Sequence, residues 1–364
     1  MPQGRLLVRA QPAQVEPAEG IGGLISIADL KVVLARLLPC WEVFKLSRAL
    51  HALRLWGPDA VFDTEHVRLP FPCRVYTGRD LLALLLDHRH FAKVVRTVEP
   101  ILASTDEGVV VESRSTTVRM EGDLGHIDTL LTVCSELGIA RDMFIRTSNG
   151  ESTVGRMVQA AVARFDPGQE MEWTLEALAR YLAPSPGWTN RFGDYYTFAC
   201  TLETLVSRRR GEGSCLGTHV PYVIVMLLRL DEEHNLLDKS SRTASPRSPR
   251  LISRRLERGQ SADGTWPYDW ARGLPGDPFP DSGRARTVAG LTLMGHHMEW
   301  IAFAPPDVRP SEGCLVRALE FLIGQTPLLV DSAVREYYHL LTHVGNALCH
   351  YAGVKAMSAY KLLL

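Results

Sequence analysis

Residues 259–270 read GQSADGTWPYDW, and this short segment directly follows a run with helical periodicity. Gly264 permits a tight turn, but a turn does not require two tryptophans, Trp266 and Trp270. The Gln260 side chain has one acceptor and two donor hydrogens, so it can bridge backbone groups at neighbouring helix ends. An indole ring can pack on an adjacent helix while its N–H finds a partner. The segment therefore predicts a structural corner between helices.

The sequence on both sides of this corner is a series of helical patterns separated by Gly and Pro. In the first, SIADLKVVLARLLP, Ser26 is a possible N-cap and Asp29 follows three residues later, close to a capping box. Further helical patterns cover 43–57, 78–95, 125–138, 152–165, 174–183, 194–209, 218–237, 286–304, 312–324, 332–344 and 345–363.

Strand patterns are few. The segment VVVESRSTTVRME, 109–121, alternates and is rich in β-branched residues, which predicts a hairpin, and HVRLPFPCRVY, 66–76, is a weaker strand pattern because of its prolines. Strands and helices do not alternate, which argues against a parallel α/β sheet. About a dozen helices can instead form a solenoid or close into a ring of helical hairpins.

Composition indicates an ordinary globular protein. Of the 364 residues, 46% are hydrophobic and 22% charged, and the net charge of −1 gives no general footprint for nucleic acid or an anionic membrane. Residues 1–25, rich in Pro, Gly and Ala, are expected to form a flexible arm before a single domain, 26–364. There is no secretory h-region and no apolar run of transmembrane length. Seven scattered cysteines without a CxxC pair indicate reduced thiols and a cytoplasmic location.

The corner resembles a known repeat. Gln260, Gly264 and Trp266, with Leu256 before them, resemble the Gln-Trp repeat of terpenoid cyclases, and RALEFLIGQ, 317–325, matches the front half of a second copy. The segment GDYYTFAC, 193–200, is similar to helix starts of protein prenyltransferases, which share the α/α toroid. The resemblance implies an all-α (α/α)6 toroid with a small β-hairpin insertion near 105–121. It also implies an enzyme that acts on a small, partly apolar, isoprenoid-like substrate in a central cavity.

The acidic motifs of those enzymes are not evident. The chain has no DxDD, and RLDEEHNLLD, 229–238, is only a distant relative of the magnesium-binding DDxxD and is expected to be a solvated helix end. A ring that binds a ligand without catalysis is therefore a further alternative. The partner expected in any case is a small-molecule substrate, without nucleic acid or a transmembrane segment, and the oligomeric state stays open.

Polar residues within apolar helical patterns are the candidates for function. LMGHHMEWIAF, 293–303, and LLTHVGNALCHYAG, 340–353, place imidazoles and a carboxylate among apolar side chains, which is costly unless these groups are paired or face a wet cavity. The catalytic candidates are His219, His296, Glu299 and His343. The candidates for substrate binding are Tyr196, Trp266, Trp270, Trp300 and Asn346.

No cofactor is predicted, and zinc or magnesium is an alternative. Cys215 and His219 are four residues apart and would share a helix face, and with His350 they could approach a thiolate–imidazole zinc site. The sequence has neither a phosphate-binding Gly-rich loop nor a nucleophile elbow, which argues against nucleotide-dependent and serine-nucleophile chemistry.

A second resemblance involves the same histidines. Residues 295–300, GHHMEW, are similar to the Gly-His-x-x-Glu-Trp motif of N-acylglucosamine 2-epimerases, and HVGNAL, 343–348, fits the string around their second histidine. This resemblance implies a carbohydrate-active α/α barrel in which His296 and His343 serve as two bases. An imidazole near neutral pKa can remove a proton next to a carbonyl, and a second imidazole can return it.

Overall fold

The computed structural model describes residues 9–40, 44–62, 76–95, 101–111, 126–208, 211, 214–274 and 284–361. These residues are mainly helical, with small two-stranded antiparallel sheets, so the predicted helical class is confirmed. No helix in these ranges combines the length and the apolar character needed to cross a membrane.

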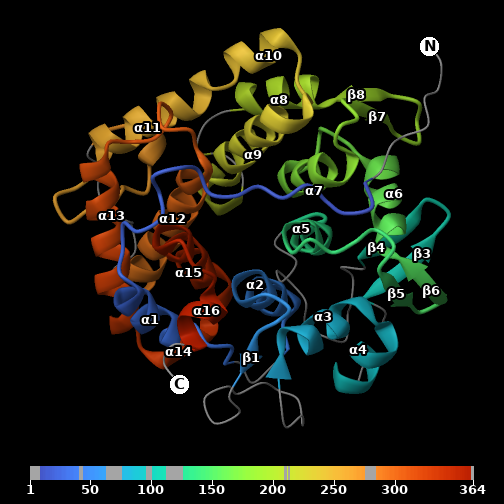
Figure 1. The fold of residues 1–364 in the computed structure, drawn as a ribbon, viewed down its shortest axis with the longest axis horizontal. Coiled ribbons are helices and arrows are strands. Elements are labelled where there is room, and N and C mark those ends of the chain that lie inside the picture. The colour runs from blue at the N-terminus through green and yellow to red at the C-terminus, as the bar shows by residue number, and fades with distance from the viewer. Residues whose placement is uncertain are drawn as a thin grey trace.

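Six helices surround the centre of the molecule (Figure 1). Each contacts the next along the chain, and the last contacts the first, so their contacts form a closed cycle. Most of their residues are buried, on several sides rather than along one stripe. These inner helices are α2 (Leu46–Trp56), α5 (Thr129–Glu136), α7 (Glu172–Leu182), α9 (His219–His234), α12 (Arg284–Phe303) and α15 (Tyr338–Ala352).

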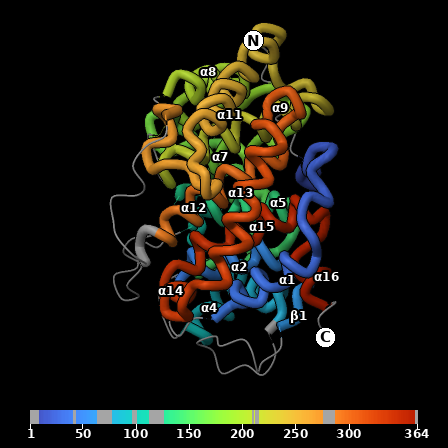
Figure 2. Tube along the Cα trace, turned by 90° about the vertical axis from the view of Figure 1, so that its left-hand side faces the viewer, coloured from blue at the N-terminus to red at the C-terminus, as the bar shows by residue number. Residues whose placement is uncertain are grey.

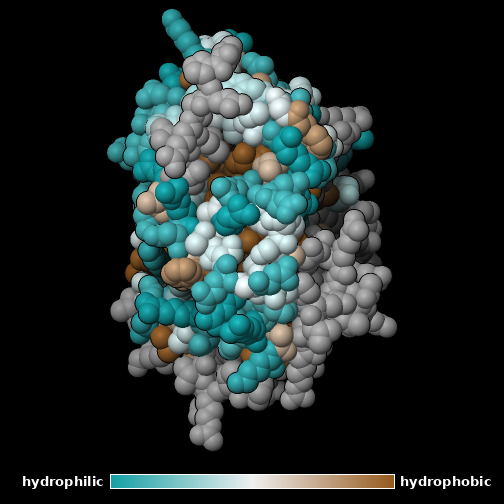
Figure 3. Space-filling view, turned by 90° about the vertical axis from the view of Figure 1, so that its right-hand side faces the viewer, coloured by the Kyte–Doolittle hydropathy of each residue, from teal (hydrophilic) through white to brown (hydrophobic). Residues whose placement is uncertain are grey.

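A second set of helices lies outside the first and contacts it. Each of these packs an apolar face inward and leaves polar residues outside, as an amphipathic surface helix does. The outer helices are α1 (Ile27–Arg36), α3 (Gly78–Leu86), α6 (Val154–Arg164), α8 (Phe198–Ser207), α11 (Arg247–Gly259) and α13 (Glu312–Gln325). On the face drawn in Figure 3, the described residues are mostly hydrophilic or weakly polar, and hydrophobic atoms show in small separate areas. The apolar side chains are thus concentrated between the two layers.

The remaining elements are short. The helices are α4 (His88–Val95), α10 (Lys239–Ala244), α14 (Asp331–Glu336) and α16 (Ala356–Lys361), with 3-10 turns η1 (Ser214–Gly217), η2 (Trp270–Arg272) and η3 (Thr326–Leu328). The strands pair as β1 (Val61–Phe62) with β2 (Tyr76–Thr77), β3 (Leu102–Thr105) with β4 (Gly108–Val111), β5 (Phe144–Thr147) with β6 (Gly150–Thr153), and β7 (Gly187–Thr189) with β8 (Tyr195–Thr197).

The hairpin predicted at 109–121 has a different register. Its second strand, β4, ends at Val111 and pairs with β3, which lies before the predicted range. A two-residue turn, Asp106 and Glu107, joins the two strands, and Gly108, with φ of +148°, is the first residue of β4. Residues 112–121 and most of the predicted strand 66–76 lie outside the described residues.

The corner at 259–270 links α11 to its neighbours. The Gln260 amide donates to the carbonyl of Cys314 on α13 at 2.9 Å and to that of Gly264 at 3.0 Å, and its oxygen accepts from Arg317 at 2.6 Å. Gly264 has φ of +90°, and a Cβ there would lie 2.2 Å from the Arg317 carbonyl oxygen. Gln260 thus ties the turn to the next outer helix, as its donors and acceptor suggested.

Residues 9–25 are packed against the inner helices, contrary to the flexible arm expected for 1–25. Their backbone N–H groups donate to last-turn carbonyls of three inner helices, for example Ala13 to Arg180 and Ala18 to Ala302, both at 2.9 Å, and Gly23 to Tyr351 at 2.8 Å. Such carbonyls have no partner within their own helix, so the segment satisfies them. In the side view, this blue segment lies along one face of the disc-like molecule (Figure 2). Residues 1–8 lie outside the described residues.

Two neighbouring inner helices, α12 and α15, approach closely at Gly295. A Cβ at this position would lie 2.8 Å from the Val344 nitrogen and 3.1 Å from the His343 carbonyl carbon. We expect Gly295→Ala to lower the free energy of unfolding by about 1–3 kcal/mol, because a helix backbone cannot yield as a side chain can. Gly324→Ala is the matched control, since nothing lies within 4 Å of its Cβ. That variant is expected to gain up to about 1 kcal/mol from helix propensity. Urea unfolding of both variants checks the pair, and equal effects would contradict the close approach.

Candidate functional site

Four histidines from separate parts of the chain lie side by side in the interior. Consecutive ring centroids are 4.5 Å apart for His126 and His219, 5.2 Å for His219 and His296, and 3.6 Å for His296 and His343. His126 precedes α5, His219 begins α9, and the other two lie on α12 and α15. We call these four side chains the imidazole row. It brings together three of the catalytic candidates that the sequence suggested and adds His126.

The fourth catalytic candidate, Glu299, lies at one end of the row. Its Oε2 is 2.6 Å from Nδ1 of His343, and its Oε1 accepts from Nη1 of Arg54 at 2.9 Å. Arg54 also lies 3.4 Å from the same His343 nitrogen, but a guanidinium only donates. The shorter contact therefore decides the tautomer: His343 Nδ1–H donates to the carboxylate, and Nε2 carries the lone pair.

Glu299 and Arg54 also belong to a buried ion cluster next to this end of the row. Arg54 binds Glu136 through two parallel contacts of 2.6 and 3.0 Å and reaches the Tyr222 hydroxyl at 3.1 Å. On the adjacent helix, Arg180 donates to Oε1 of Glu176 at 2.9 and 3.1 Å. The two arginines and the carboxylates Glu136, Glu176 and Glu299 form what we call the central ion cluster. Paired contacts of this kind compensate much of the cost of burying charge.

The charges of the central ion cluster do not balance when all five groups are ionised, because two guanidinium groups face three carboxylates. Burial and the repulsion from Glu136 raise the pKa of Glu176 to about 7. Burial also raises the pKa of Glu299, although Arg54 opposes that effect. Burial alone would raise the pKa of Glu136, but the attraction and hydrogen bonds of Arg54 lower it below its usual value. Glu176 is therefore expected to take up a proton as the pH falls through about 7.

The histidines of the row next to this cluster are neutral at pH 7. Burial, then the neighbouring His51 and Arg54, lowers the pKa of His343 well below its usual value. Burial, then His343, does the same for His296. His296 Nδ1–H donates to the Thr292 carbonyl at 2.7 Å, and its Nε2 has no hydrogen-bond partner among the described residues. Both rings thus present a basic nitrogen rather than a positive charge.

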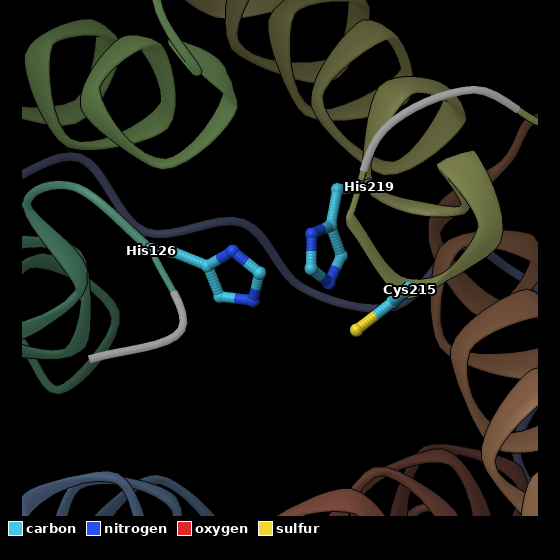
Figure 4. Close-up of side chains that lie close together, drawn as sticks. All are labelled: His126, Cys215 and His219. Atoms are coloured by element: carbon cyan, nitrogen blue, oxygen red, sulfur yellow. The ribbon is translucent and has the colours of Figure 1, made fainter. Parts of the chain in front are cut away.

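The predicted metal candidates are partly brought together. Cys215 and His219 do lie close, but the third side chain is His126: one potential ligand atom from each of the three lies within 4.8 Å of the others (Figure 4). His350 instead packs edge-on against Phe303, with ring centroids 4.7 Å apart. It lies two turns after His343, close to the end of α15, whereas Cys215 and His126 lie before the first turns of α9 and α5.

A pocket of about 430 Å³ lies next to His126. It is lined by side chains from β4, α5, α6 and the segments beside α7, with apolar and polar members in mixture. Its apolar lining includes Val110, Leu130, Ala160, Phe165 and Met171, and its polar lining includes Asp128, Arg164 and Glu170. This volume falls within the range of small-molecule sites.

The tryptophans expected at the cavity rim are part of the packed wall. Trp266 and Trp270 are 1% and 2% exposed, and both meet the edge of His297, with ring centroids 5.5 and 4.6 Å away. Trp300 is fully buried, and its Nε1–H donates to Nδ1 of His297 at 2.9 Å. Its hydrogen-bond partner is thus His297 and not His296. All three indole rings are thus packed around His297, and their substrate-binding role stays a prediction.

The two other substrate-binding candidates lie in different settings. Tyr196, in β8, packs on Phe165 and Trp188 with ring centroids 5.0 and 6.3 Å away, in an outer hairpin remote from α12 and α15 in sequence and contacts. Asn346 lies on α15 one turn after His343, and its buried amide nitrogen has no partner among the described residues. The substrate-binding role of Asn346 therefore stays a prediction.

Several polar residues of the interior were not anticipated from the sequence. Arg54 and His51 interrupt the apolar pattern of α2, and Glu176 and Arg180 lie four residues apart in a helix whose residues are all buried. Charged residues on an apolar helix face were an available signal in both cases. His126 carries no comparable signal, because it precedes α5 in an irregular segment. Comparisons of the chain with family models, curated proteins and solved structures find no match.

Proposed function

We propose that the closed cycle of inner helices is an (α/α)6 toroid and that the chain is an enzyme of the terpenoid-cyclase and prenyltransferase type. In this proposal, acid–base chemistry takes place beside the imidazole row, on a small, partly apolar substrate. The observation that carries it is the buried series His343–Glu299–Arg54. A carboxylate that fixes one ring nitrogen of a histidine leaves the other nitrogen oriented for proton transfer.

Each member of this series has a defined part in the proposal. His343 acts as the base through Nε2, and Glu299 fixes its tautomer and stabilises the imidazolium that forms. Arg54 holds Glu299 in place and keeps the carboxylate ionised. Burial and the nearby Arg54 disfavour a positive charge on His343. The 2.6 Å contact with the Glu299 carboxylate is the interaction that opposes this cost when the ring takes up a proton, and such a contact is stronger in a low-dielectric surrounding than in water.

The stacking of His296 on His343 argues against the epimerase alternative. Two-base epimerisation requires the bases on opposite sides of the substrate carbon, with the substrate between them. The ring centroids of these two histidines are 3.6 Å apart, with planes inclined by 26°, so the rings are in direct contact. No sugar fits between them in this arrangement.

The pocket next to His126 supports the proposed substrate class. Its apolar side chains suit a hydrocarbon chain. Arg164 and Arg191 offer positive charge to an anionic head group, beside the carboxylates Asp128, Asp166 and Glu170 of the same lining. Since His126 lies both in the lining of the pocket and at the end of the imidazole row, a bound molecule would have one end near His126, at the end of the row opposite to His343.

The test uses farnesyl diphosphate with magnesium as the prenyl probe, and N-acetylglucosamine and N-acetylmannosamine as the sugar probes. Calorimetry measures binding, and mass spectrometry measures conversion. We expect the prenyl probe to bind and to be converted, and His343→Gln to lower kcat by about 10²–10⁴-fold while affecting KM less. His90→Gln, on the peripheral helix α4, is the matched control and should leave kcat unchanged.

Other outcomes would overturn the proposal. Conversion of a sugar probe would support the carbohydrate-active alternative. Binding of the prenyl probe without conversion would support a ring that binds without catalysis. If neither class binds, the proposed substrate class is wrong.

A further inference from the structure

The structure brings three side chains of metal-binding character together at the N-terminal ends of the inner helices. His126 lies before α5, Cys215 lies in η1, and His219 is the first residue of α9. Figure 4 shows the two rings and the sulfur turned toward one another. Their potential ligand atoms all lie within 4.8 Å of each other, so modest side-chain rotations would bring them to a common ion.

His219 provides the first independent reason to expect a ligand. It is 5% exposed, and neither of its ring nitrogens has a hydrogen-bond partner among the described residues. An unpartnered buried imidazole is costly, and most buried polar atoms in proteins are satisfied. A metal ion bound to one of its nitrogens would remove part of that cost.

His126 provides the second reason. Its Nδ1 lies 2.7 Å from Oε1 of Glu170, so this nitrogen carries the proton and donates to the carboxylate. The lone pair is thereby left on Nε2, the other ring nitrogen. A carboxylate behind a histidine in this way is the usual second shell of a zinc ligand, because it fixes the tautomer and makes the ring a better donor.

The turn that carries Cys215 is held from both sides. Cys215 and Leu216 have φ of +49° and +59°, a left-handed conformation that is unfavourable for residues other than glycine. Thr218 Oγ1 donates to the Cys215 carbonyl at 2.7 Å, and Trp270 Nε1 donates to the Leu216 carbonyl at 3.2 Å. Trp173 also packs on both histidine rings, with centroids 5.4 and 5.0 Å away. The three side chains are thus positioned by surrounding structure, as strained functional turns are.

We propose that His126, Cys215 and His219 bind a zinc ion, with Glu170 as a positioning residue. One sulfur and two imidazole nitrogens are the donor set that zinc prefers, whereas magnesium and calcium prefer oxygen. Three protein ligands leave the fourth tetrahedral position for water or a substrate atom, the pattern of catalytic rather than structural zinc. The ion would lie at the end of the imidazole row, next to the pocket.

Metal binding can be measured without a substrate, so this proposal is tested separately from the acid–base proposal. The full chain is produced in zinc-supplemented medium and dialysed, and its metal content is measured by mass spectrometry. We expect about one zinc ion per chain, and less than about a tenth of that for His219→Ala. Glu170→Gln should keep the ion but weaken its affinity by about 10–100-fold in a chelator titration.

Cobalt substitution identifies the ligands. Adding cobalt to the metal-free protein should give a thiolate-to-cobalt charge-transfer band in the near ultraviolet. Cys215→Ser should lose this band, while Cys314→Ser, at a buried cysteine on α13, should keep it. Circular dichroism confirms that each variant is folded.

Two results would overturn the zinc site. One is wild-type protein that holds neither zinc after growth nor cobalt with a thiolate band. The other is a folded Cys215→Ser variant that binds both ions as the wild type does.

Discussion

Replacing Arg54 with Leu is expected to lower the free energy of unfolding by about 3–5 kcal/mol at pH 7, because the variant leaves two buried carboxylates without their cation. Arg54 has a side chain that is 8% exposed and pairs with Glu136 at 2.6 Å and Glu299 at 2.9 Å. Leu replaces the hydrocarbon part of the side chain, so the loss reports mainly on charge. Urea denaturation at fixed pH measures the effect.

The pH dependence of this loss has a defined sign. Without the guanidinium, Glu136 and Glu299 are expected to take up protons in the folded state at higher pH than in the wild type. The difference in stability between wild type and variant should therefore shrink as the pH falls from about 8 to about 5. Arg79→Leu is the control, because its pair with Asp59 is exposed, at 78% and 80% for the two side chains. Exposed pairs contribute about 0–1 kcal/mol. Equal losses for the two variants would contradict the importance of the central ion cluster.

Glu176→Gln is expected to change how stability depends on pH. The pKa of Glu176 in the folded protein is about 7, against a usual value of 4.5. Between these values the folded wild type holds a proton that the unfolded chain releases, so the contribution of this group to stability falls as the pH rises. Gln cannot lose a proton. The stability of the variant relative to wild type should therefore rise by up to about 3 kcal/mol between pH 4.5 and 7, at about 1.4 kcal/mol for each pH unit.

Glu203→Gln, at an exposed position on α8, is the control for this experiment and should show a flat difference over the same range. Chemical denaturation of the three proteins in a series of buffers supplies the measurement. A Glu176→Gln difference that is also flat would show that Glu176 is ionised throughout. The central ion cluster would then hold its proton elsewhere.

Most helices could be predicted from the sequence, because their apolar periodicity is local. Ser26 accepts from the Asp29 backbone N–H at 3.1 Å and caps α1 as predicted. The predicted helix at 78–95 is two helices, α3 and α4, which meet at Asp87, where the backbone is extended. The break predicted at Gly345 is wrong as well, because α15 continues through this residue. A Cβ there would lie about 3 Å from the Leu37 and Leu55 side chains, so Gly345 gives room for packing instead of ending the helix. The apolar periodicity of one helix does not indicate its contacts with other helices.

The site was less predictable, for a physical reason. His296, Glu299 and His343 could be identified because polar residues on an apolar helix face carry a cost that function or pairing has to offset. Which partner offsets this cost depends on the tertiary structure. Nothing in the local sequence indicates that Arg54 would reach Glu299, or that His126 rather than His350 would lie beside Cys215. The burial of Trp266 and Trp270 could not be predicted either, because a buried wall residue and a rim residue have the same sequence pattern.

The packing of residues 9–25 also has a consequence for the order of events during synthesis. Gly23 and Leu24 donate to the carbonyl of Tyr351, and α2 contacts α15. These early segments leave the ribosome long before their partners exist. Until α15 is synthesised, the helices that pack on it leave one apolar side exposed. Folding then depends on late contacts between distant parts of the chain, which slows folding and favours aggregation. Expression at low temperature or with a chaperone is therefore expected to increase the yield of folded protein.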